Sequence, residues 1–374
     1  MTSVAFLIDQ VFGPAPGGQG TYIRELAPAL SRVDPSLAIT LFHSRFEPSR
    51  AGREPWMSPY FTERLPWTMR RAYPSWALAG RPRLPQLIEA ANILHAPTPA
   101  GVPPAGPRQR SVVTVHDVAF LARPNLFPRR WRLTYRAGLR RAIRTADALI
   151  AVSRYTADDL LRRTNADPDK VHVVPLAASL PPSTADATET LRALGIRSPY
   201  ILFVGTIEPR KNLVALVRAY RRLAADGFDQ PLVVTGAVGW KSKRLRRELG
   251  RETPPGRIVV TGPVSETQLD ALYRGATALV YPSLHEGFGL PVLEAMARGT
   301  PCIVSRTTSL PEVAGEAALL VDPSSIEDIA TAIERVTGDA ALRSDLRAKG
   351  LTRSSEFSWD ETARRTLEVY NSVL

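Results

Sequence analysis

Residues 278–295, ALVYPSLHEGFGLPVLEA, decide the fold of this 374-residue chain. The apolar run ALVYPS (278–283) predicts a strand, and the apolar pattern from Leu290 onward predicts a helix. Gly287 and Gly289 permit a tight turn between the two elements. The unpaired amides that begin such a helix, together with its dipole, favour a bound phosphate. The stretch therefore predicts half of a βαβ unit with an anion-binding turn.

The same alternation of short apolar runs and helical patterns continues along the chain and indicates parallel sheets. The expected strands are 4–9, 38–43, 92–96, 111–117, 147–153 and 171–175, followed by 200–205, 231–236, 257–262, 278–283, 301–305 and 318–322. Residues 45–85 are rich in Pro, Arg and Trp, and we expect an irregular, partly helical excursion there. From about residue 324 the pattern predicts successive helices.

A chain of this length is too long for one ordinary core, so two domains are expected. Hydrophobic residues make up 44% and charged residues 22%, which is typical of a globular protein. A Pro/Ser/Thr cluster near residue 180 predicts a linker. We therefore expect an α/β fold of two Rossmann-like domains that face each other across a cleft. Their predicted bounds are 1–178 and 199–355, with a linker at 179–198 and a C-terminal helix at 356–374.

The cysteine content and the net charge bear on where the protein is located and what it binds. No apolar run reaches the ~20 residues that span a bilayer, and the first residues carry no basic leader. With Cys302 as its single cysteine the chain can form no internal disulfide, so a cytoplasmic location is expected. The net charge is +12, which fits nucleic acid, an anionic membrane, an anionic substrate or simple genome bias.

Two acids flank the glycine turn at an unusual spacing. Glu286 precedes the turn, and Glu294 lies eight positions later, about one turn into the predicted helix. They cannot face each other as i,i+4 neighbours do, but they can hold two parts of one extended ligand. A helix cap plus a solvated helix face is the structural alternative.

Two cations follow another strand-end turn, in GTIEPRKN (205–212). Arg210 can bind two oxygens at once, whereas Lys211 acts as a point charge. Together they suit the negative charge that develops on a departing diphosphate. Ordinary exposed residues at the start of a helix are the alternative.

Several of these stretches together resemble a known family. Glu286 and Glu294 with GFGLP between them are similar to the E-x7-E motif of retaining glycosyltransferases of family 4, which have the GT-B fold. Residues 203–213 (FVGTIEPRKNL), 297–323 and 357–370 resemble that family as well. The resemblance is strong over 200–370 and looser over 1–178. The combination is specific, although a bare E-x7-E is not.

The resemblance implies roles for matching positions. Glu294 is expected to bind the ribose hydroxyls of a nucleotide, Glu286 the donor sugar, and Arg210 with Lys211 the diphosphate. Further donor-binding positions are the amides of Gly287, Phe288, Gly289 and Leu290, the turn residue Gly205, and Val264, where backbone contacts would select the base. The resemblance also implies that the last helix crosses back to the first domain.

The first half carries a glycine loop and a strand-end histidine. Gly17 and Gly18 match the family's Gly-Gly loop, which faces the donor phosphate and the acceptor. The spacing is not G-x-G-x-x-G, so a nicotinamide cofactor is not expected. The resemblance places His116 near the donor sugar and the acceptor, with a structural histidine as the alternative. Asp117 would orient His116, cap the loop or act directly.

A basic helix is expected at 127–147. Arg132, Arg136, Arg140 and Arg144 recur every four residues and form one stripe, with aromatic residues on other faces. Such a helix can bind an anionic membrane or an acceptor, and a solvated face is the alternative. Nucleic-acid binding would leave the strand-end motifs unexplained, and no module for it is visible.

These observations predict a retaining, metal-independent hexosyltransferase. We find no His/Cys/Asp cluster with ligand spacing and no D-x-D of the kind that metal-dependent transferases use to hold diphosphate, and no cofactor is expected beyond the nucleotide-sugar co-substrate. GDP-mannose is the first expectation for the donor. The acceptor would be a glycan or a lipid-linked hydroxyl, in cell-surface polysaccharide or glycolipid synthesis. A UDP- or dTDP-sugar transferase with a small acceptor, or a nucleotide-sugar epimerase or hydrolase, are the alternatives.

Overall fold

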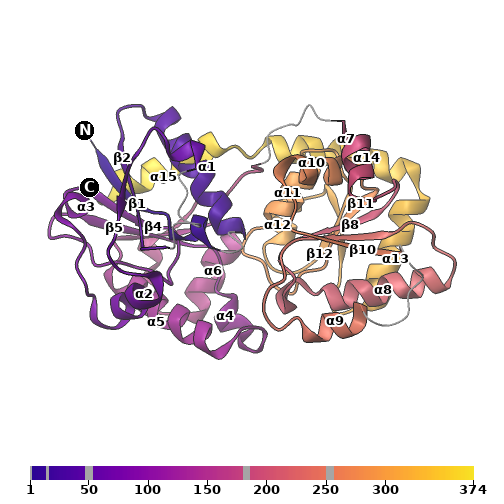
Figure 1. Cartoon of the computed structure of the whole chain (residues 1–374), viewed down its shortest axis with the longest axis horizontal. Coiled ribbons are helices and arrows are strands. Elements are labelled where there is room, and N and C mark those ends of the chain that lie inside the picture. Colours follow the sequence, from indigo (N-terminus) through magenta and orange to yellow (C-terminus); the bar gives the residue numbers. More distant parts are fainter. Residues whose placement is uncertain (1, 14–16, 47–53, 180–185, 250–256) are drawn as a thin grey trace. The chain divides into compact units, whose positions relative to one another are not determined.

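The computed structural model in Figure 1 describes residues 2–13, 17–46, 54–179, 186–249 and 257–374. The chain forms two compact units, each with its own parallel sheet. Unit 1 consists of Met1–Leu176 and Ser358–Leu374, and unit 2 of Ala177–Phe357. Residues 180–185 of the predicted linker lie outside the described residues, as do 14–16 beside the glycine loop and 47–53 in the predicted excursion.

Unit 1 has a seven-stranded sheet in the order β3-β2-β1-β4-β5-β6-β7. Its strands are β1 (Ser3–Leu7), β2 (Ala38–His43), β3 (Phe61–Arg64), β4 (Ile93–Ala96), β5 (Arg110–Val115), β6 (Ala148–Ala151) and β7 (Val171–Val173). Its α-helices are α1 (Gly17–Val33), α2 (Met69–Ala79), α3 (Gln86–Glu89), α4 (Ala119–Ala122), α5 (Arg129–Thr145), α6 (Arg154–Arg163) and α15 (Trp359–Val373). Short 3-10 helices are η1 (Asp9–Phe12), η2 (Pro55–Met57), η3 (Pro124–Leu126) and η4 (Pro168–Lys170).

Unit 2 has a six-stranded sheet in the order β10-β9-β8-β11-β12-β13. Its strands are β8 (Ile201–Val204), β9 (Leu232–Thr235), β10 (Ile258–Gly262), β11 (Ala278–Tyr281), β12 (Cys302–Ser305) and β13 (Ala318–Val321). Its helices are α7 (Ala187–Ala193), η5 (Pro209–Lys211), α8 (Leu213–Ala225), α9 (Lys243–Leu249), α10 (Glu266–Gly275), α11 (Leu290–Met296), α12 (Leu310–Ala314), α13 (Ile326–Gly338) and α14 (Ala340–Ser355). In Figure 1 helices flank the sheet of each unit.

The sheets confirm the predicted α/β class with two Rossmann-like domains. Every expected strand is present within one or two residues of its predicted ends. Strands such as β8 and β11 are buried at all four positions, because helices cover both faces of a parallel sheet. Continuous apolar runs, rather than alternating ones, are therefore what the sequence shows.

The excursion at 45–85 was predicted incompletely. Phe61–Arg64 forms β3, which pairs in parallel with β2 and extends the sheet by one edge strand. Its residues alternate poorly in hydrophobicity, and Phe61 is exposed, because an edge strand is covered less than a central one. The sequence pattern therefore did not indicate a strand in this segment, which is rich in Pro, Arg and Trp.

The last helix, α15, packs within unit 1 against α1. Its start is fixed by Ser358, whose hydroxyl oxygen accepts the amide of Glu361 at 3.1 Å. Near its end the Tyr370 hydroxyl lies 2.6 Å from Nδ1 of the buried His95. Nε2 of His95 lies 2.8 Å from the Thr114 hydroxyl, which in turn lies 2.9 Å from that of Tyr22.

This buried chain of hydrogen bonds joins α15, β4, β5 and α1. Burial, with a smaller effect of His116, lowers the pKa of His95 to about 3, so its imidazole is neutral at pH 7. A neutral imidazole has one donor and one acceptor nitrogen, and both are used here. Each hydroxyl in the chain is therefore needed to satisfy its neighbour.

We expect Tyr370→Phe to lower the free energy of unfolding by about 1–3 kcal/mol, because a buried His95 nitrogen loses its partner. Urea denaturation of the variant and the wild type measures this difference. Tyr60→Phe is the matched control, since its partner Ser31 is partly exposed and can bind water instead. Equal stability of Tyr370→Phe and the wild type would contradict a structural role for this chain of hydrogen bonds.

Candidate functional site

The predicted donor residues of unit 2 meet at the carboxyl edge of its sheet. β8 pairs with both β9 and β11. From β8 the strand order continues through β9 to β10 on one side, and through β11 to β12 and β13 on the other. Such a topological switch point is where open α/β sheets bind ligands. Arg210 and Lys211 lie in η5, after β8, and Glu286 lies in the loop after β11. The fold thus brings together residues that are far apart in the sequence.

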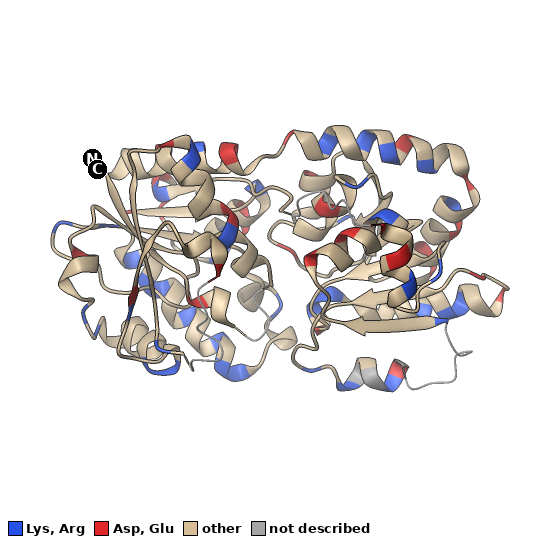
Figure 2. Ribbon diagram, turned by 45° about the horizontal axis from the view of Figure 1, so that its top comes forward, with Lys and Arg blue, Asp and Glu red and all other residues tan. Residues whose placement is uncertain are grey.

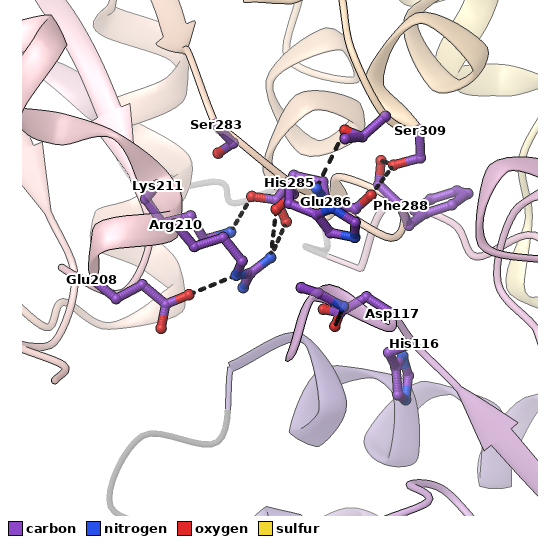
Figure 3. Close-up of polar contacts among 12 residues, drawn as sticks. His116, Asp117, Glu208, Arg210, Lys211, Ser283, His285, Glu286, Phe288 and Ser309 are labelled. Atoms are coloured by element: carbon purple, nitrogen blue, oxygen red, sulfur yellow. Dashed lines mark hydrogen bonds and ion pairs between the residues drawn. The ribbon is translucent and has the colours of Figure 1, made fainter. Parts of the chain in front are cut away.

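Glu286 bridges the two cations (Figure 3). Its Oε2 accepts a hydrogen bond from Nη1 of Arg210 at 2.8 Å, and its Oε1 accepts one from Nζ of Lys211 at 2.7 Å. Nη1 of Arg210 also donates to the carbonyl of His285 at 3.0 Å. The side chains of Glu286 and Lys211 are buried, so the charges neutralise one another largely without water.

Burial alone would raise the pKa of Glu286, but the charges of Arg210 and Lys211 outweigh it and lower the pKa to about 2. Burial lowers the pKa of Lys211, although Glu286 opposes that shift. Burial thus disfavours the charged form of Lys211, and a further anion beside its Nζ would favour that form. A diphosphate could be such an anion.

Two residues that the sequence did not single out complete this cluster. Glu208, directly before η5, accepts a hydrogen bond from Nε of Arg210 at 2.8 Å. The Tyr281 hydroxyl accepts one from Nζ of Lys211, whose charge also lies 4.8 Å from the centre of the Tyr281 ring. Two sequence features could have indicated them: Glu208 lies two positions before Arg210, and Tyr281 ends the strand-like run that precedes Glu286.

The glycine turn has the geometry that the sequence predicted. Gly289 has a φ of 118° and directly precedes α11, which has only seven residues. A Cβ at this position would lie 2.7 Å from Leu310, so only glycine fits. The hydroxyl of Ser309 donates to the carbonyls of Glu286 and Phe288, at 3.0 Å each, and fixes the turn from α12's side. Gly287 and Leu290 lie in the same fixed segment.

Glu294 lies in α11 and shares no hydrogen-bond partner with Glu286. Its Oε1 accepts from the hydroxyl of Ser179 at 3.1 Å, and its Oε2 accepts from that of Tyr273 at 2.8 Å. Burial raises the pKa of Glu294, although both hydroxyls oppose the shift. A buried acid that accepts hydrogen bonds from two hydroxyls can exchange one of them for a ribose hydroxyl.

Two further positions that were predicted to bind the donor, Gly205 and Val264, lie in the same unit. Gly205 has a φ of 147° at the end of β8, where its amide donates to Thr235 at 3.0 Å. Close packing with Gly236 accompanies this turn, since a Cβ on Gly236 would lie 2.1 Å from the Gly205 carbonyl oxygen. Val264 is half-buried in the segment between β10 and α10.

In unit 1, His116 follows β5 at the carboxyl edge of that sheet. Its Nε2 lies 3.0 Å from the carbonyl of Pro97, and its ring packs edge-on against Tyr22, with centroids 5.0 Å apart. Burial lowers the pKa of His116 to about 4, against the opposing effect of Asp117, so the ring is neutral at pH 7. A carbonyl only accepts, so Nε2 carries the proton and Nδ1 is an acceptor.

The other predicted residues of unit 1 are placed as follows. Asp117 accepts the amide of Ala119 at 3.0 Å, in the loop that leads into α4. Gly17 and Gly18 form the first turn of α1 rather than a loop before it. Both are exposed.

The basic stripe of α5 is divided by packing. Arg140 and Arg144 are exposed, whereas Arg132 and Arg136 are half-buried and Arg132 donates to the carbonyl of Pro124 at 3.3 Å. At 3.6 residues per turn, the exposed Arg129 and Leu133 fall on the same face as Arg140 and Arg144. Figure 2 shows many Lys and Arg segments in this part of unit 1.

No group of three or more potential metal ligands occurs among the residues that the structure describes. Over the same residues, no helix is both long enough and apolar enough to cross a bilayer.

Comparison with known proteins identifies the family. The family described as Glycosyl transferases group 1 matches residues 187–353, and the one described as Glycosyltransferase Family 4 matches residues 16–180. The O-antigen chain mannosyltransferase B of Escherichia coli is 33% identical over 307 residues, which cover 77% of this chain and 81% of that protein.

Two solved structures share the fold at low sequence identity. Sucrose-phosphate synthase from Thermosynechococcus elongatus has a TM-score of 0.78 and 21% identity, covering 100% of this chain and 99% of that one. HepE of Anabaena in complex with UDP-glucose has a TM-score of 0.76 and 16% identity, covering 100% of both chains. The chain therefore belongs to glycosyltransferase family 4, and it is a glycosyltransferase with the GT-B fold.

Proposed function

We propose that the enzyme transfers mannose, with retention at the anomeric carbon, from a nucleotide-diphosphate sugar to a hydroxyl group. GDP-mannose is the proposed donor, and a glycan or lipid-linked intermediate of cell-surface polysaccharide synthesis is the proposed acceptor. The observation that carries the proposal is Glu286 held between Arg210 and Lys211 at the switch point of unit 2. The O-antigen mannosyltransferase relative supports mannose as the sugar.

The charge cluster suggests how the donor binds. A diphosphate would replace Glu286 as the partner of Arg210 and Lys211, because phosphate oxygens accept the same hydrogen bonds. The displaced Glu286 carboxylate would then accept hydroxyl groups of the sugar. Two cations can stabilise the departing diphosphate without a metal ion.

Retention follows if the acceptor attacks on the face that the diphosphate leaves. The bond between the anomeric carbon and the phosphate oxygen breaks, the acceptor oxygen bonds to that carbon, and the acceptor proton passes to the leaving phosphate. No protein nucleophile is required. The neutral His116 offers Nδ1 as an acceptor for a sugar or acceptor hydroxyl, and we place the acceptor on unit 1.

A UDP- or dTDP-sugar is the second candidate for the donor. HepE of Anabaena, which shares the fold, was crystallised with UDP-glucose. Selection of the base would involve the backbone around Val264, so side chains say little about it.

Attachment to an anionic membrane is proposed for the exposed surfaces of α2 and α5. α2 packs against α5, and both helices carry exposed apolar residues and exposed arginines. These residues are Met69, Leu78, Trp131 and Leu133, with Arg70, Arg71, Arg129, Arg130, Arg140 and Arg144. Apolar side chains can enter the interface while the arginines meet lipid phosphates. Such attachment would bring the enzyme to a lipid-linked acceptor.

We expect GDP to raise Tm more than UDP, dTDP or ADP, because a ligand of the folded state stabilises it.

Glu294→Gln should weaken GDP binding about tenfold through the loss of a charge-assisted hydrogen bond to ribose. Since burial raises the pKa of Glu294, its ionised form destabilises unit 2 at pH 7, and the neutral glutamine should not lower the unliganded Tm. Glu334→Gln, at an exposed position, is the control. A variant that loses only acceptor affinity would contradict the ribose assignment.

Arg210→Ala and Lys211→Ala should each lower kcat roughly 100-fold with GDP-mannose as donor, because each removes a charge that stabilises the departing diphosphate. Turnover is measured as GDP release with and without acceptor, which also separates transfer from hydrolysis. Arg218→Ala removes an ion-paired arginine of the same unit and should leave kcat unchanged. An unchanged rate in the Lys211 variant would disprove the diphosphate role.

The double variant Arg140→Ala/Arg144→Ala should bind vesicles containing phosphatidylglycerol at least tenfold more weakly, since each arginine contributes about 1 kcal/mol near an anionic surface. Co-sedimentation at low salt measures this binding. Arg347→Ala/Lys349→Ala removes the same charge from exposed positions of α14 in unit 2 and serves as the control. Equal losses in both double variants would show that net charge alone is responsible.

A further inference from the structure

Arg210 is held by carboxylates on two sides (Figure 3). Glu208 accepts from its Nε at 2.8 Å, while Glu286 accepts from its Nη1 at the same distance. Glu208 has no part in the proposed donor contacts. Its side chain is only 2% exposed, and a carboxylate is costly to bury unless it has a specific partner.

The backbone around Glu208 is fixed independently of Arg210. The amide of Ile207 donates to the carbonyl of Ala237 at 2.8 Å, and the amide of Gly239 donates to the carbonyl of Ile207 at 3.0 Å. A Cβ on Gly239 would lie 2.8 Å from Thr206 and 3.4 Å from the Cβ of Glu208. The segment after β9 therefore packs tightly on the segment that carries Glu208. A carboxylate on such a support is a fixed point from which to orient a long side chain.

A second carboxylate matters because of how guanidinium groups pair. An arginine beside a single carboxylate favours a bidentate pair, with two parallel N–H···O bonds. Here each Glu286 oxygen accepts from a different cation, and Nε of Arg210 is bonded to Glu208. Because Nε of Arg210 donates to Glu208, it does not form a two-bond pair with Glu286. A diphosphate would have to break such a pair in order to bind Arg210.

We propose that Glu208 is a positioning residue that keeps the Arg210 guanidinium oriented for the donor diphosphate when Glu286 turns to the sugar. This inference rests on the proposed function of Arg210. Burial raises the pKa of Glu208, and Arg210 opposes the shift, as expected for a carboxyl group that is buried for its contact with this arginine. The accepting oxygen, rather than the negative charge, is what the role requires.

The test compares Glu208→Ala with Glu208→Gln by calorimetric titration of GDP and of guanosine. Glu208→Ala should weaken GDP binding about tenfold while guanosine binding stays within twofold, because the phosphate contacts alone depend on Arg210. Glu208→Gln keeps an accepting oxygen and should bind GDP at least as tightly as the wild type. Glu248→Ala is the matched control, since Glu248 is another buried carboxylate of unit 2 that pairs with arginines, Arg218 and Arg221.

Three results would overturn the assignment. They are unchanged GDP binding in Glu208→Ala, an equal loss for GDP and guanosine, and a loss in Glu208→Gln as large as in Glu208→Ala. The second result would indicate a general disturbance of the unit, which the Glu248 control and Tm values reveal independently. If the wild type binds UDP instead of GDP, the same comparison is made with UDP and uridine. A wild-type protein that binds no nucleoside diphosphate contradicts the proposed function itself.

Discussion

The bridge from Glu286 to Arg210 and Lys211 is the interaction on which the site of unit 2 depends. It joins the loops that follow β8 and β11. These strands are neighbours because β9 and β10 extend the sheet on one side of β8, and the chain then returns to place β11 on the other side. A buried charge requires a partner, and here the two cations come from one loop and the carboxylate from the other. If either loop moved away, a buried charge would lose its partner. The cluster therefore holds the two loops at the edge of the sheet without a ligand.

This arrangement also explains why the cluster is suited to exchange. Burial alone would raise the pKa of Glu286, but the charges of Arg210 and Lys211 lower it, while burial lowers the pKa of Lys211 against the opposing effect of Glu286. A diphosphate carries more negative charge than one carboxylate and would favour the charged form of Lys211 more strongly. In the proposed binding the cations exchange Glu286 for phosphate oxygens and keep a partner throughout, whereas removing a partner outright would leave a buried charge unpaired.

The sequence predicted the fold and located the charged residues Arg210, Lys211 and Glu286 that the structure brings together, because both follow from strong local signals. Apolar runs that end in Gly or Pro-Ser located the strands, and the E-x7-E spacing located Glu286 and Glu294. β3 was missed because an edge strand needs no regular alternation, and its pairing with β2 is decided by tertiary packing. Tyr281 was missed because the sheet brings it to Lys211 from a distant part of the sequence, and Glu208 was missed because its short spacing from Arg210 does not by itself indicate a buried contact. The basic stripe of α5 was divided for the same kind of reason, since α5 turns Arg132 and Arg136 partly inward and leaves Arg140 and Arg144 exposed.

The two units differ in the charged residues that follow the strands at their switch points, and this difference bears on the proposed donor site. In unit 1 the switch point lies between β1 and β4, and Asp9, which begins η1 shortly after β1, is buried. Ser44 donates both its amide and its hydroxyl to this carboxyl group, at 2.6 Å each. Burial raises the pKa of Asp9, against the opposing hydrogen bonds of Ser44. The proposed function therefore places the diphosphate beside the cations Arg210 and Lys211 of unit 2, and it places the acceptor on unit 1, which carries the neutral His116.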